Sequence, residues 1–126
     1  MKKILILSGG YSKEKEISRS SAKSIYKTLK DKYKILVCEP DSEFISKIKK
    51  FKPDVVYNSL HGRFGEDGYI QALLENLKVK YTHSGVNSSS IAMDKEISKR
   101  IFIRNNIRTP KFLKLNNFDL IKDKNT

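Results

Sequence analysis

The sequence predicts an α/β fold built on a doubly wound parallel sheet of about four strands. Two observations lead to this prediction: short apolar runs alternate with amphipathic stretches of helical period, and only short polar loops join them. Crossovers between such elements are right-handed and bring successive strands into one parallel sheet, with helices on both faces. A chain of 126 residues is long enough to bury such a core without disulfide bonds.

Four apolar segments are predicted as strands. The first, Lys2–Ser8, is a continuous apolar run, which is typical of a strand buried on both faces of a parallel sheet. The other three are Tyr33–Cys38, Asp54–Asn58 and Val79–Thr82. The sole cysteine, Cys38, ends the second strand and is expected to be a buried residue rather than a nucleophile.

Three segments between the strands are predicted as helices, because apolar residues recur on one face of each. They are Glu16–Lys30, Ser42–Phe51 and Asp67–Leu77, and Asp67 is expected to be the N-cap of the third. Further helical stretches follow the fourth strand as far as Asn106.

The regular pattern ends at Thr109-Pro110. We therefore predict one amino-terminal α/β domain over residues 1–110, with residues 111–126 as a linker or the beginning of another domain. The apolar run near the amino terminus covers only Ile4–Leu7, which is too short for a signal sequence or a membrane span. Together with the single cysteine, this predicts a soluble cytoplasmic protein that does not act at a membrane.

The formal net charge of +12 raises the question of nucleic-acid binding, but the charge is unevenly distributed. Residues 54–94 carry 3 basic and 5 acidic side chains, so the glycine-rich middle of the chain is slightly acidic. Lysines outnumber arginines 21 to 5, whereas specific recognition of phosphate and guanine favours arginine. The sequence has no zinc-finger spacing and no aromatic RNA-binding signature. Specific binding of nucleic acid is therefore disfavoured.

Three polar loops that contain glycine follow predicted strands. They are SGGYSKEKE (8–16), NSLHGRFGEDG (58–68) and YTHSGV (81–86), after the first, third and fourth strands. Parallel sheets bind ligands beyond the carboxyl ends of their strands, and all three loops fall on that edge. Their placement alone predicts a binding site there.

Each charged residue near this edge has two interpretations. Glu14 lies at the predicted start of a helix, where an acid either stabilises the helix dipole or holds a ligand ammonium. His61 is either a structural residue or a site residue that Glu66 orients. Lys95 either faces solvent or reaches a nucleotide phosphate. The Gly9-Gly10 turn matches no dinucleotide or phosphate-loop motif, and no pair of residues has the spacing of a zinc site.

Several motifs in register resemble one family. The segments LSGGYSKEKEIS, NSLHGRFGEDGYIQALLE, YTHSGV and IAMDKEISK, in this order and at these separations, resemble the amino-terminal domain of D-alanine–D-alanine ligases. The resemblance implies a Rossmann-like domain of an ATP-grasp enzyme. Such an enzyme joins two D-alanines with ATP and magnesium, and the product is used in bacterial cell-wall peptidoglycan.

The resemblance also implies roles for individual residues. Glu14 matches the family's amino-terminal catalytic glutamate, which would anchor the ammonium group of the first D-alanine. His61 and Glu66 match the family's loop histidine and glutamate and, with Ser84, would complete the first substrate pocket. Lys95 matches a lysine near the nucleotide phosphates. No metal ligand of the family falls in this chain.

The sequence also departs from the family pattern. Lys15 stands where the family usually has arginine, Arg19 where leucine is common, and His83 where glycine is usual. We expect Arg19 to point outward, and His83 either to adjust the pocket or to face solvent. The family continues through two further domains that hold ATP and magnesium, so this chain alone is expected to lack ligase activity.

Two other functions remain open on the sequence alone. A stand-alone domain that binds an amino acid or regulates a partner would account for the length of the chain. A basic nucleic-acid-binding protein would account for the charge but not for the loops. The sequence does not determine whether the second substrate is D-alanine, D-serine or D-lactate, or whether the protein forms a homodimer.

Overall fold

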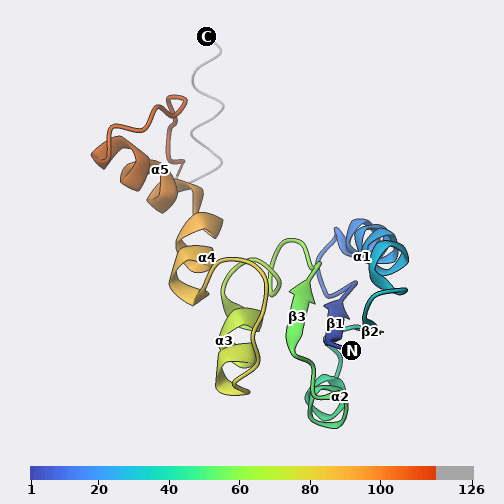
Figure 1. The fold of residues 1–126 in the computed structure, drawn as a ribbon. Coiled ribbons are helices and arrows are strands. Elements are labelled where there is room, and N and C mark those ends of the chain that lie inside the picture. The colour runs from blue at the N-terminus through green and yellow to red at the C-terminus, as the bar shows by residue number, and fades with distance from the viewer. Residues whose placement is uncertain (116–126) are drawn as a thin grey trace. The chain divides into compact units, whose positions relative to one another are not determined.

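The computed structural model describes residues 1–115, in a chain that divides into two compact units, Met1–Met93 and Asp94–Thr126. In chain order, the first unit contains β1 (Lys3–Leu7), α1 (Lys15–Leu29), β2 (Lys34–Cys38), α2 (Phe44–Phe51), β3 (Val55–Asn58), α3 (Tyr69–Asn76) and α4 (Val86–Met93), as Figure 1 shows. The second unit contains α5 (Lys95–Arg104). The domain boundary after residue 110 stays a prediction, and most of the segment 111–126 lies outside the described residues.

The fold is α/β with a parallel sheet, as predicted, and its strand order is β2–β1–β3. The central strand, β1, pairs with a neighbour on each side. Leu7, its last residue, lies opposite both Cys38 at the end of β2 and Asn58 at the end of β3. The three strands therefore end at the same level, and the loops that follow them leave from one edge of the sheet.

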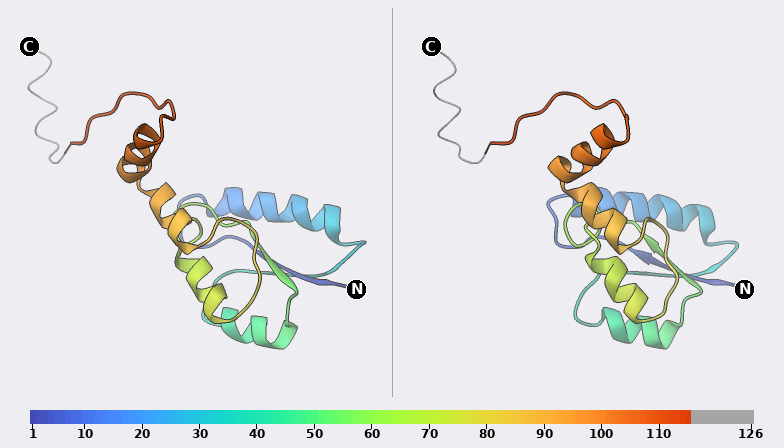
Figure 2. Two further views of the ribbon diagram at one scale, coloured as in Figure 1. Left: turned by 60° about the vertical axis from the view of Figure 1, so that its left-hand side comes forward. Right: turned by 90° about the vertical axis from the view of Figure 1, so that its left-hand side faces the viewer.

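Helices cover both faces of this sheet (Figure 2). On one face, Ile4 and Ile6 of β1 pack with Ala22 of α1. On the other face, Leu5 and Leu7 belong to a larger core cluster, to which α2 and α3 contribute Phe44, Ile48, Ile70 and Leu74. Successive residues of a strand point to opposite faces, so the continuous apolar run of β1 supplies both clusters.

The number of strands differs from the prediction. In place of a fourth strand at Val79–Thr82, only Tyr81 forms an isolated parallel bridge, with Val56 of β3. The pairing stops at Thr82, whose Oγ1 accepts the N–H of Asn58 at 3.2 Å. The next residue, His83, has a φ of 91°, and this conformation turns the chain away from the direction of a strand.

The start of α3 also differs from the prediction. Asp67 is not the N-cap; that position is taken by Gly68, which has a φ of 96°. The carboxylate of Asp67 instead accepts the N–H of Phe64 at 2.9 Å and the N–H of Tyr69 at 3.1 Å. A Cβ atom on Gly68 would lie 2.8 Å from the carbonyl oxygen of Val86. Only glycine allows this close approach between the starts of α3 and α4.

Two further features bear on the sequence predictions. Within residues 1–115, none of the helices combines the length and the apolar character that a membrane span requires. Cys38 is buried, as expected, and burial raises the pKa of its thiol to about 11. The thiol therefore stays protonated near neutral pH, which makes it a poor nucleophile.

A pH-dependent contribution to stability is expected from Tyr81. Its hydroxyl donates to Oε1 of Glu75 at 2.6 Å, and this bond raises the pKa of Tyr81 from 10.0 to about 12. An acid with a raised pKa in the folded state adds stability below its unfolded pKa, and that stability is lost as the pH rises through the folded pKa. Between about pH 9 and about pH 12, the free energy of unfolding should therefore fall more in the wild type than in Tyr81→Phe. Urea unfolding at both pH values measures the difference, and equal falls would contradict it.

Candidate functional site

Two loops meet at the carboxyl edge of the sheet. Glu14 is the N-cap residue of α1, in the loop that follows β1. Gly62 lies in the loop that follows β3, and it has a φ of 72°. A Cβ atom on Gly62 would lie 3.0 Å from Oε2 of Glu14 and 3.1 Å from Cβ of Ser12. The carboxylate of Glu14 therefore rests directly against the second loop, and a larger residue at position 62 would displace it.

The second loop brings His61 and Glu66 together on either side of Gly62. Oε2 of Glu66 accepts the N–H of Gly62 at 2.7 Å, and Oε1 lies 3.8 Å from Nδ1 of His61. Nε2 of His61 is buried and has no hydrogen-bond partner among the described residues. Glu14 and Glu66 thus place two carboxylates next to one glycine, beside an imidazole. This arrangement suits a ligand with a positively charged group.

The other two predicted site residues are placed differently. Ser84 is exposed, and its carbonyl oxygen accepts the hydroxyl of Ser89 at 3.1 Å. In the part of the chain that the structure describes, no hydrogen bond joins Ser84 to Glu14 or to the second loop. Lys95 begins α5 in the other compact unit, so its position relative to the two loops is not determined and its role stays a prediction.

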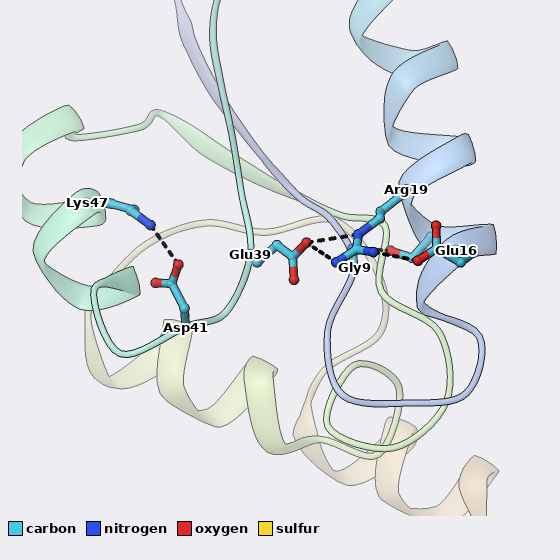
Figure 3. A network of polar contacts seen from close by, with 7 residues as sticks. Gly9, Glu16, Arg19, Glu39, Asp41 and Lys47 are labelled. Atoms are coloured by element: carbon cyan, nitrogen blue, oxygen red, sulfur yellow. Dashed lines mark hydrogen bonds and ion pairs between the residues drawn. The ribbon is translucent and has the colours of Figure 1, made fainter.

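The loop after β1 is fixed by contacts that the sequence did not predict (Figure 3). The N–H of Gly9 donates to the buried hydroxyl of Ser18 at 2.9 Å. The carboxylate of Glu39, just after β2, packs so closely on Gly9 that a Cβ there would lie 2.6 Å from it. Nε and one terminal nitrogen of Arg19 donate to the same oxygen of Glu39 at 2.9 and 2.7 Å. Arg19 also pairs with Glu16, so its guanidinium joins α1 to the end of β2.

These charges act on one another in a predictable direction. The hydrogen bond to Glu39, followed by the charge of Glu16, raises the pKa of Arg19. A second pair in Figure 3 joins Lys47 of α2 to Asp41 at 2.8 Å, and this bond lowers the pKa of Asp41. Both pairs are largely exposed, and solvent-exposed ion pairs contribute little to stability. Their effect is to orient the loops.

A cavity of about 390 Å³ lies beside the two loops. Gly9, Gly10 and His61 line it, together with residues of α2 and α3. Three aromatic rings in edge-to-face contact also line it. The centroid of Phe64 lies 5.8 Å from that of Tyr11 and 5.3 Å from that of Tyr69. Glu14 and Glu66 do not line this cavity. The two carboxylates next to Gly62 therefore lie outside the lining of this cavity, whereas His61 belongs to it.

Comparison with known proteins supports the assignment that the motifs suggested. A family model described as the D-ala D-ala ligase N-terminus matches residues 39–84. A D-alanine–D-alanine ligase of Pelagibacter ubique is 63% identical over 116 residues, which cover 91% of this chain and 38% of that protein. The chain is homologous to the amino-terminal region of D-alanine–D-alanine ligases. A Wolbachia ligase (Brugia malayi strain TRS) is 46% identical over 121 residues and is matched over 36% of its length.

Solved structures agree with this homology. The D-alanine–D-alanine ligase of Bacillus anthracis, in a crystal structure with ATP, superposes with a TM-score of 0.80 at 35% sequence identity. The match covers 96% of this chain and 42% of that one. The D-alanyl-alanine synthetase A of Vibrio cholerae matches with a TM-score of 0.76 at 28% identity. The chain thus spans between a third and a half of the length of these four relatives.

Replacement of Gly62 tests the contact between the loops. In Gly62→Ala, the methyl group meets Oε2 of Glu14, and the residue must also adopt a φ of 72°. We expect the fold to persist with a loss of about 1–3 kcal/mol in the free energy of unfolding. Amide chemical shifts should change at Ser12 and Glu14, the residues that the methyl group displaces.

Gly85→Ala is the matched control, because a Cβ there would meet nothing closer than 3.8 Å. Its free energy of unfolding should not fall. If Gly62→Ala behaved like Gly85→Ala in both measurements, the close packing of Glu14 on the second loop would be refuted.

Proposed function

We propose that this chain is the amino-terminal part of an ATP-dependent D-alanine–D-alanine ligase and that it binds the first D-alanine. The observation that carries the proposal is the packing of Glu14 against Gly62, next to His61 and Glu66. A D-alanine zwitterion needs an anion for its ammonium and hydrogen-bond donors for its carboxylate. Both are available where these two loops meet.

Each residue has a defined part in this proposal. Glu14 accepts hydrogen bonds from the substrate ammonium and fixes its direction. The first turn of α1, which begins at Lys15, favours the substrate carboxylate through its N–H groups and its dipole. His61 and Glu66 close the pocket on the side of the second loop, and Ser84 borders it from the loop after the Tyr81 bridge. These groups act by orienting the substrate and by stabilising charge.

ATP and magnesium belong to the same proposal, but the described residues do not form a site for either. Within residues 1–115, no group of three or more His, Cys, Asp or Glu side chains is placed to hold a metal ion. Lys95 is the only residue that we assign to the nucleotide. We infer that other parts of such a ligase hold ATP and magnesium, activate the substrate carboxylate and bind the second D-alanine. The product would serve cytoplasmic synthesis of peptidoglycan precursors.

A chimeric enzyme tests the proposal. Residues 1–115 of this chain replace the matching segment of the Pelagibacter ubique ligase, which is 63% identical to it. The chimera should form D-alanyl-D-alanine from D-alanine and ATP. In the chimera, Glu14→Gln should lower kcat/KM by about tenfold to two-hundredfold, because a charged hydrogen bond in a desolvated pocket contributes roughly 1.5–3 kcal/mol.

Glu16→Gln is the matched control. Glu16 lies two residues further along and pairs with Arg19, and it has no part in the proposed pocket. Its kcat/KM should stay within about twofold of the unmodified chimera. An active chimera in which Glu14→Gln and Glu16→Gln had the same kinetics would remove Glu14 from the binding site.

A further inference from the structure

Two buried amide side chains bind the same backbone carbonyl in the second loop. Nδ2 of Asn58 donates to the carbonyl oxygen of Gly65 at 2.7 Å, and Nε2 of Gln71 donates to the same atom at 3.0 Å. Asn58 ends β3 and Gln71 lies in α3, and each side chain is 1% exposed. We call these three residues the Gly65 clamp. It fastens the middle of the loop to the two elements that the loop connects.

Asn58 also fixes the beginning of the loop. Its Oδ1 accepts the N–H of Leu60 at 3.1 Å, while its Nδ2 holds Gly65. The loop folds back on itself so tightly that a Cβ on Gly65 would lie 2.4 Å from Cβ of Leu60. One side chain therefore sets the distance between two points of the loop backbone, and glycine is required at the second point.

The two fixed points are the residues that immediately precede the site side chains. Leu60 precedes His61, and Gly65 precedes Glu66. The carboxylate of Glu66 then reaches back to the N–H of Gly62 at 2.7 Å and lies 3.8 Å from His61. The two hydrogen bonds of Asn58 therefore act on the separation of His61 and Glu66, together with the bonds from the N–H groups of Gly65 and Glu66 to the carbonyl oxygen of Gly62 at 3.3 and 3.0 Å.

The buried amide of Gln71 is not the side chain that stability alone would favour. Its Oε1 is buried and has no hydrogen-bond partner among the described residues. A buried acceptor without a partner is costly, and an apolar side chain of the same shape would avoid that cost. The presence of an amide at this position is therefore better explained by the hydrogen bond that its Nε2 donates to the carbonyl oxygen of Gly65.

We propose that Asn58 and Gln71 are positioning residues that set the geometry of His61 and Glu66. The part of this inference that concerns D-alanine binding rests on the proposed function. The part that concerns the geometry of the loop is independent of it. Among the described residues, neither amide is hydrogen-bonded to His61 or Glu66. Gln71 acts through the backbone of Gly65, and Asn58 acts through the backbones of Gly65 and Leu60.

The test uses Gln71→Met, which keeps the shape of the side chain and removes both its donor and its unpartnered acceptor. In the 126-residue chain, the melting temperature should be unchanged or higher. Hydrogen exchange of the Gly62 N–H should become about tenfold faster, because Glu66 no longer stays over it. Nuclear Overhauser effects between the ring of His61 and the side chain of Glu66 should weaken. Asn58→Leu should show the same changes together with a lower melting temperature, since it also leaves the N–H of Leu60 without its partner.

Tyr81→Phe is the control, because it removes a 2.6 Å hydrogen bond in the same unit but outside the loop. It should leave the exchange of Gly62 unchanged. If Gln71→Met also left the exchange and the Overhauser effects unchanged, or changed them only in proportion to a lower melting temperature, the positioning role would be refuted.

The active chimera separates this inference from the proposed function. There, Gln71→Met should raise the KM for D-alanine by about threefold to tenfold with a smaller change in kcat. An inactive chimera whose loop still loosens in Gln71→Met would overturn the proposed function and support the positioning role. An active chimera with unaltered KM in Gln71→Met would overturn the role of the clamp in binding.

Discussion

The pairing of β1 with a parallel strand on each side is the constraint on which the rest of the first unit depends. Because Leu7 lies opposite both Cys38 and Asn58, the three strands end together. The loops that begin after these residues therefore all lie at one edge of the sheet. The apolar run of β1 enforces this arrangement, since Leu5, Ile6 and Leu7 are completely buried and supply both core clusters. The convergence of the loops at this edge is a consequence of the core.

At that edge, glycines mark the places where a side chain packs directly on the backbone of a loop. Glu39 packs on Gly9, Glu14 on Gly62, and Leu60 on Gly65, and a Cβ at each glycine would lie between 2.4 and 3.0 Å from its neighbour. The site is thus assembled from contacts between side chains and bare backbone. Such contacts leave little room for adjustment, which is compatible with the small amino-acid substrate that we propose.

The sequence was sufficient for the features that depend on local patterns. Apolar runs and helical periodicity predicted the three strands and the helices. The predicted ends of these elements lie within two residues of the observed ends. The prediction of a fourth strand was wrong. An apolar segment indicates burial, but it does not show whether strand pairing continues, and here the pairing stops at Thr82. The prediction of Asp67 as the N-cap of α3 was also wrong. Gly68 occupies that position, where its backbone approaches the carbonyl oxygen of Val86 closely. The convergence of Glu14 and the second loop followed from topology, whereas the Gly65 clamp joins residues that no local pattern links.

The charge of the whole chain says little about what this site binds. Although the net charge is +12, the segment 54–94 is slightly acidic, and the carboxylates of Glu14 and Glu66 both lie next to Gly62. At physiological ionic strength, charges further away than about 8 Å are largely screened at a protein surface. Lysines on distant helix faces therefore influence a ligand at Gly62 only weakly, whereas Lys13 and Lys15, which flank Glu14, and Arg63, which follows Gly62, are basic residues close to it along the chain. Our proposal of an amino-acid substrate therefore rests on the local arrangement of Glu14, Gly62 and Glu66 and not on the net charge.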